Sequence, residues 1–215
     1  MRSWNVIAAS LVLPLAFSAA ARATVIYSES VSGDLSNNQA APTALTLGLG
    51  TNSVIGNVNG NVGDSQDWVA LRVPAGLDLT GDVLAAYSST DNQGFTGFQV
   101  GSSFVGNPLT ATPYAGYSHF GTAVTNTGQT PGVSLVGVNL IPLMALNGAG
   151  QVAQGSSGFT QPLGPGTYTF LIQQLGASTN YQFDFDTTAV PEPGSIGLIG
   201  VGVFGLLRRR HRKIA

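Results

Sequence analysis

Two aspartates separated by two residues could supply oxygen ligands to a cation. Asp64 and Asp67 lie in a turn rich in glycine, asparagine and serine, directly before an apolar segment. Ca²⁺ takes carboxylate and backbone carbonyl oxygens. Glu29 and Asp34 could join such a site, because the first strand of a β-sandwich often meets a later turn. Aspartates in turns also cap the local backbone, so the sequence leaves a Ca²⁺ site and turn capping as two open interpretations.

Hydrolytic chemistry has fewer candidates. Ser118 and His119 are adjacent, and adjacent side chains of a strand point to opposite faces, so they do not form a ready nucleophile–base pair. Asp184 and Asp186 could serve as a carboxylate pair for glycoside hydrolysis, but residues two apart on a strand share one face, which we expect to be solvated. We therefore predict no catalytic residues. A secreted polysaccharide or ester hydrolase that uses aspartates or His119 stays open as an alternative.

Trp68 begins the apolar segment that follows Asp67. A tryptophan at the start of a strand usually packs in the core, but an exposed indole ring can also stack on a sugar. Together with the candidate Ca²⁺ ligands, this leaves a Ca²⁺-dependent carbohydrate-binding module as a second alternative function.

The composition limits the partners. The chain has 215 residues, of which 43% are hydrophobic, 8% are charged and none is cysteine, so disulfides and thiolate metal sites are excluded. Between residues 24 and 189, nine acidic residues stand against one basic residue, Arg72, which gives this part a net charge of −8. Such a body does not bind nucleic acid through phosphate contacts. It is also repelled by anionic polymers unless cations bridge the two.

Residues 1–23 have the pattern of a secretory signal peptide. One positive charge precedes a long apolar run, and Ala21 and Ala23 form the small-residue pattern of a cleavage site. We expect signal peptidase to cut before Thr24, which leaves residues 24–189 as one exported domain. A membrane anchor is the alternative interpretation of the apolar run.

Residues 190–215 have three parts. Pro191, Glu192 and Pro193 form a stiff, extended tripeptide, because proline fixes φ and restricts the residue before it. About a dozen apolar residues follow, and as a helix they would span about 20 Å, less than the ~30 Å hydrocarbon core. The chain then carries a basic cluster made of Arg208, Arg209, Arg210, Arg212 and Lys213. This cluster would stay on the cytoplasmic side, so we expect a short hydrophobic helix that anchors the chain transiently in the inner membrane.

The order of these parts resembles the PEP-CTERM sorting signal of Gram-negative bacteria. The resemblance covers residues 190–213. It implies recognition by an exosortase, a membrane-embedded transpeptidase-like enzyme that would cut at or near Pro191-Glu192-Pro193. It also implies delivery of the body to the cell surface or to the exopolysaccharide matrix of a biofilm. An ordinary tail anchor is the alternative.

Short β-type segments separated by turn residues fill the body. The clearest are residues 167–173 and 181–186, where aromatic residues recur at every second position and one face is therefore buried. We expect these two segments to form a hairpin, Asn59-Gly60 to form a type I′ turn, and residues 143–146 to form one helical turn. The other expected strands are residues 25–31, 53–58, 67–73, 83–88, 97–100 and 133–140. The sequence thus predicts an all-β fold, a single jelly-roll-like antiparallel β-sandwich.

Part of this body resembles bacterial pre-peptidase C-terminal (PPC-like) domains. Residues 64–76 (DSQDWVALRVPAG) are similar to the D-x-D-W/Y-F-x-F-x-V-x-A-G core of these domains. Residues 164–168 and 180–183 are similar to the two halves of their closing hairpin. The resemblance implies a small jelly-roll sandwich that acts as a binding or stabilising module.

Together these features predict a non-catalytic exported protein of the cell surface or extracellular matrix, sorted by an exosortase-type transpeptidase. Its expected partners are signal peptidase, the exosortase and an extracellular polysaccharide, and not nucleic acid. No cofactor is expected apart from Ca²⁺ at Asp64 and Asp67.

Overall fold

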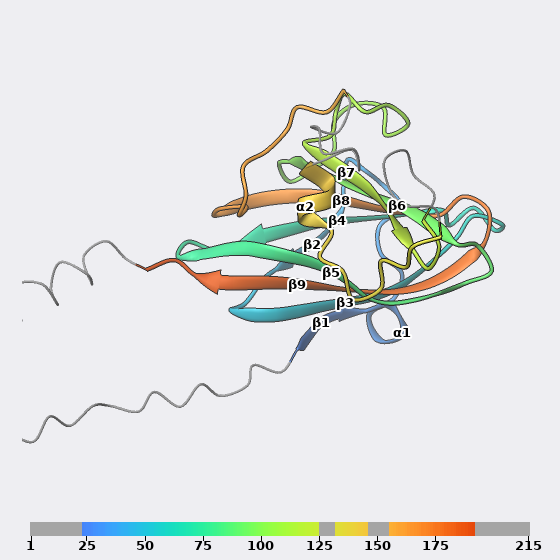
Figure 1. The fold of residues 1–215 in the computed structure, drawn as a ribbon, viewed down its shortest axis with the longest axis horizontal. Helices are drawn as coiled ribbons and strands as arrows, with labels where there is room; N and C mark the ends of the chain where they lie inside the picture. The colour runs from blue at the N-terminus through green and yellow to red at the C-terminus, as the bar shows by residue number, and fades with distance from the viewer. Residues whose placement is uncertain (1–22, 125–131, 146–154, 192–215) are drawn as a thin grey trace, which may run out of the picture.

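The computed structural model describes residues 23–124, 132–145 and 155–191. Within them the chain forms two stacked β-sheets and two short helices, α1 (Glu29–Ser32) and α2 (Ile141–Ala145) (Figure 1). The strands of the four-stranded sheet are, in order, β1 (Thr24–Ser28), β3 (Gly50–Asn59), β9 (Ser178–Ala189) and β5 (Leu77–Ser89). Those of the five-stranded sheet are β2 (Thr43–Thr46), β4 (Gln66–Val73), β8 (Gly166–Gln173), β6 (Gln93–Val100) and β7 (Gly116–Gly121).

The chain crosses repeatedly between the two layers. The first six strands, β1 to β6, pass back and forth between the four-stranded and the five-stranded sheet. This winding confirms the predicted all-β, jelly-roll-like sandwich. Helix α2 packs against β7 and β5, which are edge strands of the two sheets, and its Ile141 and Met144 are buried.

Two strand pairs are parallel, which the predicted antiparallel sandwich did not include. β1 pairs with β3, and β2 pairs with β4, each at one edge of a sheet. Both pairs arise because the chain passes through the opposite sheet between the paired strands and returns in the same direction. The other pairs among the described strands are antiparallel.

The expected hairpin between the last two strands is wrong. β8 pairs with β4 and β6, whereas β9 pairs with β3 and β5, so β8 and β9 belong to different sheets. Phe170 of β8 and Phe185 of β9 meet across the interior, with ring centroids 5.5 Å apart. Hydrophobic residues recur at every second position of a strand both when the next strand lies beside it in the same sheet and when the next strand faces it across the core. The pattern therefore could not show whether β8 and β9 form a hairpin or lie in different sheets.

The type I′ turn at Asn59-Gly60 is also wrong. Such a turn needs positive φ at both central residues, and no non-glycine residue of the described chain has positive φ. The connection instead leads from β3 in one sheet to β4 in the other.

Residues 133–140 do not form the expected strand. Gly137 has φ of 83°, a left-handed conformation that interrupts an extended segment. Isolated bridges join this stretch to Val83 and Val124 instead. Leu135 is still buried, because its apolar side chain packs into the core. The helical turn expected at 143–146 is present as α2, although it begins two residues earlier.

The core lies between the two sheets. Its aromatic rings come from β6, β7 and β8 on one side and from β9 on the other. A second, smaller cluster lies on the outer face of the five-stranded sheet, where Trp68 of β4 and Leu171 of β8 pack under Phe104 and Tyr114 from the connection between β6 and β7. Trp68 is 0% exposed, so it cannot serve as the sugar-stacking surface that its sequence position left open.

The first strand begins and the last strand ends on the same side of the sandwich. Thr24 of β1 is in register with Asn52 of β3, which is in register with Phe185, near the end of β9 at Ala189. The turns from β5 to β6 and from β8 to β9 lie at the opposite end of the molecule (Figure 1). We call the first the exit end and the second the turn end.

Candidate functional site

Three acidic side chains from separate parts of the chain meet at one site. Glu29 lies in α1, Asp34 follows this helix, and Asp67 is on β4. One carboxylate oxygen of each lies within 4.8 Å of those of the other two. The Trp68 N–H donates to the Ser36 carbonyl oxygen (2.8 Å), which ties the segment after α1 to the start of β4. Glu29 and Asp34 therefore lie close to Asp67, in the arrangement that the sequence left open.

Asp67 is the buried member of this cluster. Its side chain is 0% exposed, and the Tyr181 hydroxyl donates to Oδ2 at 2.6 Å, while Oδ1 has no hydrogen-bond partner. Burial raises the pKa of Asp67 to about 8, the carboxylates of Glu29, Asp64 and Asp34 add to this rise, and the hydrogen bond from Tyr181 opposes it. The site therefore has an excess of negative charge, and its buried Oδ1 atom has no hydrogen-bond partner.

Glu29 is fixed by the backbone of two neighbouring segments. Its Oε1 accepts a hydrogen bond from the Leu35 N–H (3.1 Å), and its Oε2 accepts one from the Asn57 N–H (2.6 Å). Burial raises the pKa of Glu29, and these two backbone hydrogen bonds oppose the rise. Gly56 makes room for the site, because a Cβ there would collide with the hydroxyl of Tyr181 and push it away from Asp67.

Asp64 lies beside the cluster. Burial raises the pKa of Asp64, a hydrogen bond from Asn37 opposes the rise, and the charge of Asp34 adds to it. Of the two predicted ligands, Asp67 joins the close group and Asp64 interacts with it through charge. Sequence reasoning missed Tyr181, whose position on the inner face of β9 gave no sign of a polar partner across the sandwich.

This arrangement has the chemistry of a hard-cation site. Carboxylate oxygens are the ligands that Ca²⁺ takes, and a divalent ion would offset the mutual repulsion of Glu29, Asp34 and Asp67. A ligand for Oδ1 of Asp67 would also satisfy a buried oxygen that the protein leaves unpaired.

Ser118 and His119 do not act together. Ser118 is buried on the inner face of β7, and its hydroxyl donates to the carbonyl oxygen of His119 (2.9 Å). The His119 ring lies on the outer face, edge-on to Phe95 with ring centroids 5.7 Å apart. Burial lowers the pKa of His119. The expected separation of the two side chains is confirmed.

Asp184 and Asp186 lie along the outer face of β9 and are engaged by hydroxyl groups of β3. Ser53 donates to Asp184 Oδ1 and Thr51 donates to Asp186 Oδ1, each at 2.6 Å. The Gln182 amide also donates to Asp184 Oδ1 (2.8 Å). These carboxylates stabilise the sheet surface.

The folded body ends directly before the predicted sorting tripeptide. Ala189 is the last residue of β9, and the Val190 N–H donates to the Gly76 carbonyl oxygen at 2.8 Å. Pro191, the last described residue, is exposed. In the described part of the chain, the last strand therefore ends two residues before the tripeptide begins.

Residues 189–213 match the family model of the PEP-CTERM protein-sorting motif. The chain carries a PEP-CTERM motif. This motif indicates an exported protein that is sorted at the membrane by an exosortase-type enzyme. The match spans Pro191-Glu192-Pro193 and the basic cluster.

Most of the PEP-CTERM motif lies outside the described residues, and so do its expected hydrophobic helix and the predicted signal peptide up to residue 22. Neither helix in the described part of the chain is long and apolar enough to cross a membrane. No curated protein and no solved structure matches the chain significantly. The resemblance of the body to PPC-like domains is not confirmed.

Proposed function

We propose that this PEP-CTERM protein is a non-catalytic component of the cell surface or extracellular matrix, delivered there by an exosortase-type transpeptidase. The position of the motif carries the proposal. Within the described residues, β9 ends at Ala189 and Val190 still donates to the sandwich, while the tripeptide begins at Pro191, so a cut in the tripeptide would release the body without breaking a described strand.

The charge of the body supports a place in a hydrated polymer layer. Nine acidic residues against one arginine between residues 24 and 189 keep copies of the body apart and soluble. Such a surface would associate with acidic polymers through bridging cations.

Exchange of Glu192 for alanine tests the sorting route. From the wild-type host culture, we expect a protein that runs from Thr24 to near Pro191, in the envelope or matrix fraction. The Glu192→Ala variant should keep its basic cluster and stay with the inner membrane, because the tripeptide is the expected recognition element. Intact-mass spectrometry of each fraction measures both results.

Ser195→Ala is the matched control for this experiment, because Ser195 lies in the matched segment but outside the tripeptide. This variant should be processed like the wild type. Wild-type protein that keeps residues up to 213 in the inner membrane would contradict the proposal.

As a second function, we propose that Glu29, Asp34 and Asp67 bind Ca²⁺. The specific observation is Asp67, which is 0% exposed, has one carboxylate oxygen without a hydrogen-bond partner, and contributes an oxygen to a group whose members lie within 4.8 Å of one another. The ion would join the segment around α1 to β4 and so fasten the edge of the four-stranded sheet to the other layer.

Calcium should raise the melting temperature. At a Ca²⁺ concentration one hundred times Kd, binding stabilises the folded state by about 2.7 kcal/mol, which corresponds to a rise of about 5–10 °C for a protein of this size. Asp34→Asn should abolish most of the rise without disturbing the core, because Asp34 is exposed. Differential scanning calorimetry with and without Ca²⁺, after removal of metal by a chelator, measures the effect.

The matched control is Asp78→Asn on β5, outside the cluster, which should keep the full response to Ca²⁺. Equal melting temperatures of the wild type with and without Ca²⁺ would refute the site.

A further inference from the structure

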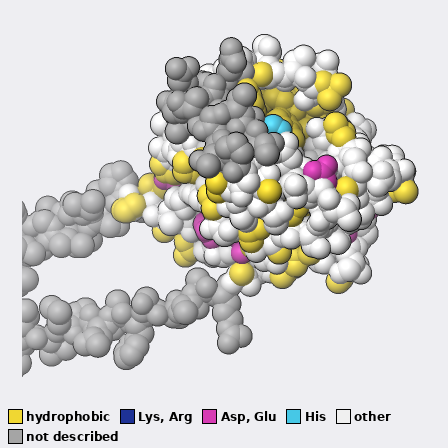
Figure 2. Space-filling view, turned by 45° about the vertical axis from the view of Figure 1, so that its right-hand side comes forward, with side chains coloured by type: hydrophobic (Ala, Val, Ile, Leu, Met, Phe, Trp, Pro, Cys, Tyr) yellow, Lys and Arg dark blue, Asp and Glu magenta, His cyan; other side chains and the backbone are white. Residues whose placement is uncertain are grey.

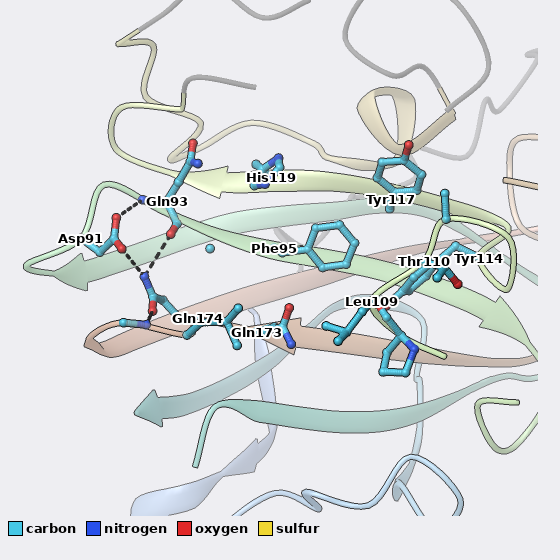
Figure 3. Close-up of a pocket in the computed structure, with 15 residues that line it drawn as sticks. Asp91, Gln93, Phe95, Leu109, Thr110, Tyr114, Tyr117, His119, Gln173 and Gln174 are labelled. Carbon is cyan, nitrogen blue, oxygen red and sulfur yellow. Dashed lines mark hydrogen bonds between the residues drawn. The ribbon is translucent and has the colours of Figure 1, made fainter. Parts of the chain in front are cut away.

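A cavity of about 490 Å³ opens on the outer face of the five-stranded sheet, at the turn end. Figure 2 shows the histidine side chain set into a hollow bordered by hydrophobic side chains. Phe95 of β6, Tyr117 of β7 and Leu109 from the β6–β7 connection line this cavity, together with residues of the two turns (Figure 3). Its size is in the range of small-molecule sites.

Three of the side chains that line the cavity form a row on neighbouring strands. Phe95 is in register with Gln173 of β8 on one side and with His119 of β7 on the other. An aromatic ring therefore lies between an amide and an imidazole on one face of the sheet (Figure 3). The ring of Tyr117 stacks near that of Phe95, with centroids 5.8 Å apart and planes 30° apart, and so extends the aromatic surface.

Two polar atoms in this row have no partner. Nε2 of Gln173 and Nδ1 of His119 are shielded from water, and neither makes a hydrogen bond. Gln173 is only 6% exposed. A buried donor without a partner costs about 1–3 kcal/mol. The unpaired atom of Gln173 is an N–H donor, so a fitting ligand brings an oxygen acceptor.

The charge of the cavity restricts that ligand further. Among the described residues that line it, Asp91 is the one carboxylate, and there is no lysine or arginine. The carboxylate of Asp91 is engaged, because the Gln174 amide donates to its Oδ2 at 2.6 Å. An anionic ligand would meet no positive charge here. A quaternary ammonium ion would offer no acceptor to Gln173. The ligand class that remains after these exclusions is a neutral molecule with an apolar face and several oxygen atoms.

We propose that this cavity binds a neutral sugar unit of an oligo- or polysaccharide. The C–H-rich face of a pyranose ring would pack on Phe95 and Tyr117, and its hydroxyl groups would pair with Gln173 and His119. The members of the acidic cluster, Glu29, Asp34 and Asp67, do not line the cavity, so binding requires no Ca²⁺. Sugar binding at this cavity also does not depend on the route by which the protein is exported.

Saturation-transfer NMR on the protein purified from its host tests this assignment. The probes are glucose, galactose, mannose, xylose and N-acetylglucosamine, each at about 10 mM, which populates a site of millimolar affinity. At least one should bind saturably, and binding should persist in EDTA. Glucuronic acid and choline, as the anionic and cationic probes, should not bind. Absence of binding by all neutral sugars, or a preference for either charged probe, would overturn the proposal.

Variants locate the site. Phe95→Leu keeps an apolar side chain but removes the ring face, and should weaken binding by about tenfold or more. His119→Ala, on edge strand β7, is a second variant should Phe95→Leu fail to fold, and it should weaken binding as well. Val100→Ala is the matched control, because Val100 is an exposed residue of the same strand outside the cavity. Wild-type affinity in both folded cavity variants would show that the sugar binds elsewhere.

Discussion

Replacing Asp82 with asparagine is expected to flatten the pH dependence of stability. Asp82 lies on β5 with its side chain 1% exposed, and neither of its carboxylate oxygens has a hydrogen-bond partner. Burial raises the pKa of Asp82 from its ordinary value of 3.8 to about 8, and the negative charge of Asp186 adds to the rise.

The sign of the pH dependence follows from the difference in proton binding between the folded and the unfolded state. Between pH 3.8 and about 8, the unfolded chain has lost the Asp82 proton while the folded protein keeps it. The free energy of unfolding therefore falls as pH rises through this window, by about 1.4 kcal/mol per pH unit for this group. Asp82→Asn removes this contribution, since asparagine does not titrate. Asp67 contributes in the same direction in both proteins.

Urea unfolding followed by circular dichroism at several values between about pH 5 and 8 measures the two slopes. Asp78→Asn is the control, because Asp78 lies on the same strand but is partly exposed. It should keep the wild-type slope. Parallel curves for the wild type and Asp82→Asn would show that Asp82 does not retain its proton in the folded state.

Truncation of Phe183 should cause a large loss of stability. Phe183 of β9 is 1% exposed, and its ring meets that of Phe120 on β7 edge-on, with centroids 5.1 Å apart. This contact joins the two sheets. Phe183→Ala should lower the free energy of unfolding by about 3–5 kcal/mol, because it removes buried surface and leaves a cavity.

Thr188→Ala provides the comparison on the same strand. Thr188 is exposed near the end of β9, and its exchange should change stability by less than about 0.5 kcal/mol. Chemical denaturation of both variants measures the difference. A loss below about 1 kcal/mol for Phe183→Ala would mean that the sheets are held together mainly by other contacts.

The sequence predicted the strands with strong alternation well. β8 and β9 appear where hydrophobic residues recur at every second position, because this period determines which side chains are buried. β4 appears where the sequence has a compact apolar segment. β2 and β7 were missed, since each is short and β7 mixes glycine, serine and histidine with its aromatic residues.

The sequence predicted which strands pair less well than it predicted where the strands lie. The predicted hairpin of β8 and β9 failed because Tyr168 and Phe170 would face a core in either arrangement. The predicted strand at 133–140 failed because apolar content alone does not reveal the left-handed Gly137. Both errors concern where the chain goes next, which depends on contacts between residues distant in sequence.

One candidate site could be predicted from the sequence, and the other could not. Aspartates before a strand suggested the acidic cluster, and the common meeting of a first strand with a later turn suggested Glu29 and Asp34 as partners of Asp67. The cavity on the outer face of the five-stranded sheet gave no such signal. Phe95, His119 and Gln173 come from three strands that become neighbours only through the order β8-β6-β7.

The position of the exit end determines how the sandwich is oriented relative to the point where its C-terminus is attached. The strand leading to the sorting motif leaves the sandwich there, and β1 begins nearby. The cavity and the residues around Asp67 lie toward the turn end. A copy tethered through its C-terminus would therefore stand with the cavity and the acidic cluster on the side away from the anchor. Neighbouring copies in a layer would all present the same outward face to the surrounding polymer.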